Sequence, residues 1–124
     1  MQLAIGLYDG FTALDFVGPY QVLVNRPGTE VVLCAAQPGV VPDDMGNLRL
    51  EVDRGFADVP SPDIVLVPGG FVTGQIARDG HPIVEWVRTA HPTTTWTTSV
   101  CTGALVLGAA GVLDGLDATT HWVA

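Results

Sequence analysis

The chain of 124 residues is long enough for one domain, and with 48% hydrophobic and 15% charged residues it can bury a core. Its 13 acidic residues against 5 basic ones give a net charge of −8, which argues against binding to nucleic acid or to an anionic membrane surface. Two cysteines are too few for a disulfide scaffold, and no basic signal segment precedes the first apolar run, so we expect a reduced, cytoplasmic protein.

The first half of the chain predicts a strand, a helix, a second strand and a hairpin. Residues 3–7 and 31–36 are continuous apolar runs, which are typical of strands buried on both faces of a parallel sheet. Residues 15–25 carry apolar side chains at helical spacing, and Pro19 is acceptable only in the first turn of that helix. Residues 40–59 alternate between apolar and polar side chains, which predicts a hairpin on the edge of the sheet.

The second half continues the alternation of strands and helices. Residues 64–67 form a third apolar run, and residues 96–100, rich in Thr and Trp, form a weaker fourth. Residues 81–90 predict an amphipathic helix, and residues 102–110, small and apolar on all sides, predict a helix buried against a sheet. The whole pattern predicts one α/β domain over residues 1–124, a three-layer sandwich with a mostly parallel sheet.

Ligands of such sheets bind beyond the carboxyl ends of the strands, which directs attention to residues 9–11, 68–70 and 99–101. Cys101 lies between the fourth strand and the helix that follows it. A nucleophile at such an elbow is exposed, the helix N-terminus behind it favours the thiolate, and the backbone N–H of Thr102 can donate to an oxyanion. The alternative is a buried structural cysteine.

Three further candidates have equally plain structural alternatives. Asp15 is either a carboxyl group near the thiol or a first-turn carboxylate that stabilises its helix. Gly70, in a Gly-Gly pair after the third strand, is either a backbone donor to a ligand or part of an ordinary tight turn. His121 is either a general base for Cys101 or a core histidine.

The remaining residues of these types predict no chemistry. His81 and His91 flank a helix and are expected on the surface, and Cys34 lies within a strand and is expected to pack in the core. No group of His, Cys and carboxylate residues has the spacing of a metal site.

Together these segments resemble the ThiJ/PfpI superfamily, whose members are similar in fold to class I glutamine amidotransferases and have a flavodoxin-like sheet with a nucleophile elbow. The resemblance covers essentially the whole chain. Its most specific part begins at Ser99-Val100-Cys101-Thr102-Gly103-Ala104 and ends at Ala118-Thr119-Thr120-His121-Trp122, and the sequences Leu14-Asp15-Phe16-Val17-Gly18-Pro19-Tyr20 and Val67-Pro68-Gly69-Gly70 agree with it.

Within that superfamily the sequence is most similar to the isonitrile hydratase branch. The resemblance implies that Cys101 is the nucleophile, that Asp15 is its acid–base partner and that Thr102 lines the site, with Gly70 and Thr102 as backbone donors. It implies hydration of an isonitrile to an N-substituted formamide without a cofactor, through a thioimidate that water attacks. It also implies a homodimer that acts on a small molecule.

Two other activities occur among similar proteins. The ligand-sensing domain of AraC-type transcription regulators shares the motifs and precedes a helix-turn-helix domain, which this sequence does not show. The protease, amidase, chaperone and glyoxalase-like branches commonly carry Glu in place of Asp15 and His in place of Thr102, so this sequence departs from them at both positions. Superfamily members continue past the Thr-His-Trp motif, so we expect residues 1–124 to be the N-terminal portion of the usual domain.

Overall fold

The four apolar runs each form a strand of one parallel sheet, as predicted. The computed structural model describes all residues from 1 to 124. The five strands follow the order β5-β2-β1-β6-β7, and every neighbouring pair is parallel. Their bounds are β1 (Gln2–Gly6), β2 (Glu30–Ala35), β5 (Arg54–Gly55), β6 (Ile64–Val67) and β7 (Trp96–Ser99).

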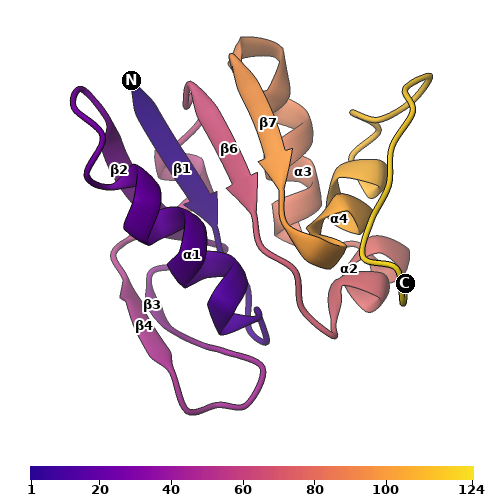
Figure 1. Cartoon of the computed structure of the whole chain (residues 1–124), viewed down its shortest axis with the longest axis horizontal. Helices are drawn as coiled ribbons and strands as arrows, with labels where there is room; N and C mark the ends of the chain where they lie inside the picture. The colour runs from indigo at the N-terminus through magenta and orange to yellow at the C-terminus, as the bar shows by residue number, and fades with distance from the viewer.

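Helices lie on both faces of this sheet. Figure 1 shows α1 in front of β1 and β2, and α3 behind β7. The helices are α1 (Ala13–Leu23), α2 (Thr73–Asp79), α3 (Pro82–Ala90) and α4 (Ala104–Ala109), and three single 3-10 turns are η1 (Phe56–Asp58), η2 (His91–Thr93) and η3 (Cys101–Gly103). None of the helices has the length and apolar character needed to cross a membrane.

The predicted hairpin forms, but it does not occupy the edge of the main sheet. Strands β3 (Gly39–Pro42) and β4 (Arg49–Val52) pair antiparallel as a separate two-stranded sheet. The edge position beside β2 is taken by β5, in which Arg54 and Gly55 pair with Cys34 and Ala35. The prediction was wrong on this point because alternation identifies a hairpin but not the strand beside which it lies.

Helix α1 begins earlier than predicted, and this changes the place of its proline. The helix begins at Ala13, so Pro19 lies in the second turn rather than the first. The earlier start follows from the preceding residue, because the Thr12 N–H donates to the Gly69 carbonyl at 2.7 Å and directs the chain straight into the helix. Pro19 has no N–H to donate to the Asp15 carbonyl, so the helix lacks one hydrogen bond there.

The core lies between the sheet and its helices, and α3 contributes an aromatic contact to it. The Trp86 ring stacks on Phe56 at 4.9 Å, and its Nε1–H donates to the Val59 carbonyl at 2.8 Å. The ring also covers Gly6, where an added Cβ would lie 2.5 Å from a ring carbon. Helix α2 was not predicted, because it is short and buries only Thr73 and Ile76.

Candidate active site

The three segments singled out at the carboxyl edge of the sheet meet in the structure. Phe11 forms an antiparallel bridge with Gly70, which joins the segment after β1 to the segment after β6. The Val100 N–H donates to the Val67 carbonyl at 3.0 Å, which holds the segment after β7 beside them. Because β1, β6 and β7 are neighbours and parallel, their ends form one site.

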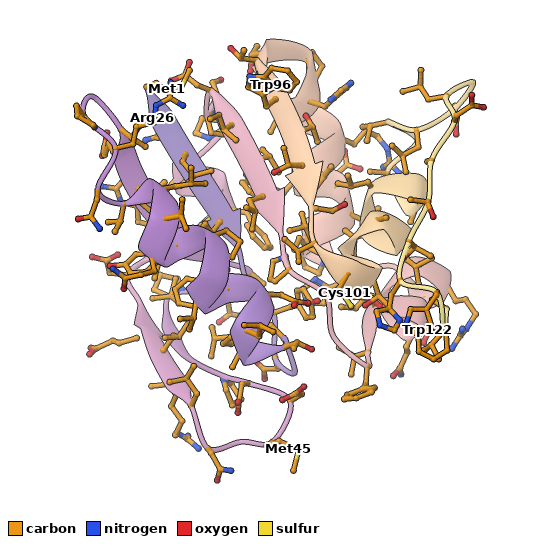
Figure 2. The ribbon with its side chains drawn as sticks, viewed as in Figure 1. Met1, Arg26, Met45, Trp96, Cys101 and Trp122 are labelled. Carbon is orange, nitrogen blue, oxygen red and sulfur yellow. The ribbon has the colours of Figure 1, made fainter.

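Cys101 occupies a strand-to-helix elbow. Its φ of 55° makes it the one non-glycine residue with a positive φ, a conformation that an L-residue adopts only at a steric cost. Its side chain is exposed beyond the end of β7 (Figure 2). The helix approaches the sheet closely behind it, because a Cβ on Gly103 would lie 2.3 Å from the Val67 carbonyl oxygen. The tight turn therefore presents the thiol to solvent.

Asp15 is 7% exposed and lies in the first turn of α1, but its hydrogen bond goes to another part of the chain. The Gly69 N–H donates to Asp15 Oδ2 at 3.1 Å. The other oxygen, Oδ1, accepts no hydrogen bond, yet no buried side-chain oxygen lacks a partner, so Oδ1 is accessible to solvent. The carboxyl group is thus held by one oxygen and free at the other.

Gly69 is the point at which the candidate residues converge. A Cβ built on Gly69 would lie 2.7 Å from Asp15 Oδ2, 2.8 Å from Cys101 Cβ and 2.8 Å from the Thr102 backbone nitrogen. Only the absence of a side chain at Gly69 allows these groups to approach one another. The structure therefore brings together Asp15, Cys101 and Thr102, which the sequence had suggested one by one.

Thr102 and Gly70 form a reciprocal pair beside the thiol. The Gly70 N–H donates to Thr102 Oγ1 at 3.1 Å, and the Thr102 hydroxyl donates to the Gly70 carbonyl at 3.0 Å. The Gly70 N–H is therefore engaged with Thr102 rather than directed at an empty space. The Thr102 backbone N–H lies in the first turn after the elbow, and its role as an oxyanion donor stays a prediction.

Tyr8 belongs to the site but was not predicted. Its hydroxyl donates to the Pro68 carbonyl at 2.6 Å and fixes the segment that carries Gly69. Burial raises the pKa of Tyr8 far above its ordinary value, and the negative charges of Asp15 and Cys101 raise it further. Tyr8 is therefore a permanent hydrogen-bond donor beneath the site. Its place two residues beyond β1, at the carboxyl edge, was the available signal.

His121 lies near the elbow, but its imidazole bonds elsewhere. The Thr120 hydroxyl donates to the Cys101 carbonyl at 3.1 Å and brings the C-terminal segment to the elbow. His121 Nδ1 accepts the Val123 N–H at 3.1 Å, and the ring stacks against the exposed Trp122 at 5.4 Å between centroids. A role for His121 as a general base stays a prediction.

The residues for which the sequence predicts no chemistry lie in different environments. Cys34 is fully buried, its thiol donates to the Ile5 carbonyl at 3.7 Å, and burial raises its pKa to about 12. His81, expected on the surface, is instead the N-cap of α3, where Nδ1 accepts the Ile83 N–H at 3.1 Å. No three His, Cys, Asp or Glu side chains lie close enough together to hold a metal ion.

Known proteins are similar to this chain in sequence. Residues 1–124 match the sequence model of the DJ-1/PfpI family. The isonitrile hydratase of Pseudomonas putida is 38% identical over 122 residues, which are 98% of this chain and 53% of that protein. The HTH-type transcriptional regulator CdhR of Pseudomonas aeruginosa is 28% identical over 123 residues, 95% of this chain and 36% of the regulator.

A solved structure gives the same fold. The crystal structure of a ThiJ/PfpI family protein from Pseudomonas syringae superimposes with a TM-score of 0.89 at 32% identity, and the match covers 98% of this chain and 50% of that one. The chain thus spans about half the length of the Pseudomonas putida hydratase and of this protein.

Proposed function

This chain belongs to the DJ-1/PfpI family, and we propose that it carries the catalytic cysteine of a lyase that hydrates a small isonitrile to an N-substituted formamide. The observation that supports the proposal most strongly is the approach of Asp15 and Cys101 around Gly69. A thiol and a carboxyl group within reach of one substrate atom are the parts that nucleophilic catalysis with proton transfer requires.

The first step forms a covalent intermediate. Asp15 acts as the acid and gives a proton from its accessible oxygen to the terminal carbon of the isonitrile. The Cys101 thiolate bonds to the same carbon, and the product is a thioimidate in which that carbon is doubly bonded to nitrogen. Asp15 is left as a carboxylate. The Gly69 N–H, bonded to Oδ2, fixes the orientation of the carboxyl group during this transfer.

The second step releases the product. The Asp15 carboxylate takes one proton from a water molecule, and the water oxygen bonds to the thioimidate carbon while the nitrogen gains the second proton. The carbon–sulfur bond then breaks, and Cys101 leaves as the thiolate. Asp15 ends protonated, so one water molecule is consumed and both groups return to their starting state. The Thr102 N–H can stabilise negative charge on oxygen as the adduct collapses.

Three variants test this assignment with a simple alkyl isonitrile, by following formation of the formamide. Cys101→Ala should abolish turnover, and Asp15→Asn should lower kcat at least about a hundredfold, because an amide cannot cycle a proton. Asp43→Asn is the matched control, since Asp43 is also buried and its carboxyl group accepts a backbone N–H, from Leu48 in the hairpin. An active Asp15→Asn protein would remove Asp15 from the mechanism, and thermal melts of all three variants would exclude unfolding as the cause of any loss.

A second candidate function is ligand sensing within a transcription regulator, and the match to CdhR over 95% of this chain favours it. A sensor must bind its ligand but need not convert it. A protein that hydrates no isonitrile, yet is alkylated selectively at Cys101, would support sensing over catalysis.

A further inference from the structure

We propose that a second pocket, separate from Cys101, binds a small organic cation of the alkylammonium class. The pocket has a volume of about 510 Å³, which lies within the range of small-molecule sites. Its lining includes none of Cys101, Asp15, Gly69 or Thr102, and it shares only Tyr8 with the surroundings of the thiol.

Three segments enclose this pocket, which we call the β1–α2 pocket. The three residues that follow β1, Leu7 to Asp9, form its floor, and the turn between β2 and β3 forms one wall. Helix α2 and the following turn to α3 form the other wall. Apolar side chains line its deep part, where Leu7, Val41 and Ile76 are buried.

The negative charge of the residues that line the β1–α2 pocket favours a cationic ligand. Asp9 and Asp79 are exposed on the lining, and neither accepts a hydrogen bond from a side chain or backbone nor forms an ion pair. No Lys or Arg lines the pocket, so nothing offsets these two charges. His81 also lines the pocket, and burial lowers its pKa against the opposing effect of Asp9, so its ring stays neutral near pH 7.

The mixture of carboxylates and apolar side chains favours an organic cation over a metal ion. A hard cation needs about six oxygen ligands, whereas only two carboxylates line this pocket, and no three metal-binding side chains cluster in the chain. The apolar walls would remain unfilled around a bare ion. An alkylammonium places its charge near Asp9 or Asp79 and its hydrocarbon against Val40 and Val72.

Calorimetric titration with hexylammonium chloride, with 1-hexanol as the uncharged control, tests this proposal. Hexylammonium should bind at millimolar or lower concentration and more tightly than hexanol. Asp9→Asn and Asp79→Asn should each weaken hexylammonium about threefold, the range expected of partly exposed ion pairs, and the double variant about tenfold. Asp117→Asn removes the same charge from an exposed position outside the pocket and should change nothing.

Several results would overturn the proposal. These are equal affinity for hexanol and hexylammonium, unchanged affinity in the double variant, an equal loss in Asp117→Asn, or no binding at all. Carboxamidomethylation of Cys101 separates the two sites. Affinity for hexylammonium should survive this modification, whereas its loss would place the cation at the thiol. Because the readout is binding, it is independent of isonitrile turnover.

Discussion

One cysteine lies within a strand of the parallel sheet and the other lies just beyond the end of a strand, and the structure gives them opposite environments. Cys34 lies inside β2, paired in the ladder with Gly6 of β1, and it is completely buried. Cys101 lies two residues beyond Ser99, the last paired residue of β7; it is exposed and has a φ of 55°. The residue type is the same, and only the backbone position differs.

The exposure of each thiol depends on whether its residue lies within a strand or beyond the end of one. A side chain within a central strand is enclosed by the layers on both faces, so the Cys34 thiol meets only the Ile5 carbonyl and has a pKa raised to about 12. A side chain at the turn out of a strand escapes those layers. It then lies beside the segments that follow neighbouring strands, which at Cys101 are the first turn of α1 with Asp15 and the turn with Gly69.

The largest expected effect is in alkylation. A thiol with a pKa of about 12 is ionised in roughly one molecule in ten thousand at about pH 8, and Cys34 is also inaccessible. Iodoacetamide should therefore label Cys101 at least about a thousandfold faster than Cys34 in the folded protein. Peptide mass spectrometry measures both rates, and labelling in guanidinium, where the two should become similar, is the control. Similar labelling rates of Cys34 and Cys101 in the folded protein would contradict the proposed difference between the two cysteines.

A methyl group added at Gly69, where Asp15, Cys101 and Thr102 meet, should have the next largest effect, on activity. Gly69→Ala places a Cβ within 2.8 Å of Cys101 Cβ and of the Thr102 nitrogen, closer than real contacts allow, so the elbow must shift. We expect kcat for isonitrile hydration to fall about a hundredfold, the cost of a displacement of about 1 Å at a catalytic group. Gly18→Ala, where nothing lies within 4 Å, is the control. That variant should keep activity and gain up to about 1 kcal/mol in helix stability.

Removing one hydroxyl group should have a smaller effect. Tyr8→Phe loses the hydrogen bond to the Pro68 carbonyl and leaves that buried acceptor unpaired, at a cost of about 1–3 kcal/mol in unfolding free energy. Turnover should fall as well, since Pro68 precedes Gly69. Tyr20→Phe is the control, because Tyr20 stacks on Phe16 and its hydroxyl makes no hydrogen bond. Equal denaturant midpoints for the two variants would show that Tyr8 only fills space.

The smallest expected effect is on the pH dependence of stability. Burial lowers the pKa of folded His81 below the ordinary 6.5, so the unfolded chain binds this proton more readily. The stabilisation is complete above about pH 6.5 and is lost as the pH falls through the lower folded pKa. His81→Asn keeps a capping oxygen for α3 but cannot titrate, so its melting temperature should fall less between about pH 7 and pH 5. The same fall as in the parent protein would contradict this, and His91→Asn, at an exposed position, is the control.

Much of the fold was predictable because the signals were local. The runs that became β1, β2 and β6 were continuous and apolar, and each predicted range agrees with its strand within one residue. Helix α2 lacked such a signal, since it has one turn of good spacing and a glycine within it. The placement of Pro19 depended on a hydrogen bond between Thr12 and Gly69, which no local pattern contains.

The individual residues of the candidate site were predictable from the sequence, but the contacts among them were not. Asp15 and Cys101 each stood at the end of a strand or the start of a helix, so each was a candidate. Their meeting depends on β1, β6 and β7 being neighbours in the sheet, which the order of elements along the chain leaves open. Tyr8 was missed because a tyrosine at the end of an apolar strand has the same pattern as a core residue.

The central claim is that Cys101, and not Cys34, forms a bond to the substrate. Rapid acid quenching of the protein during turnover of an alkyl isonitrile, followed by peptide mass spectrometry, tests it directly. The claim predicts an adduct with the mass of the isonitrile on the Cys101 peptide, none on the Cys34 peptide, and none in Cys101→Ala. Turnover by Cys101→Ala, or an adduct on any other residue, would contradict it.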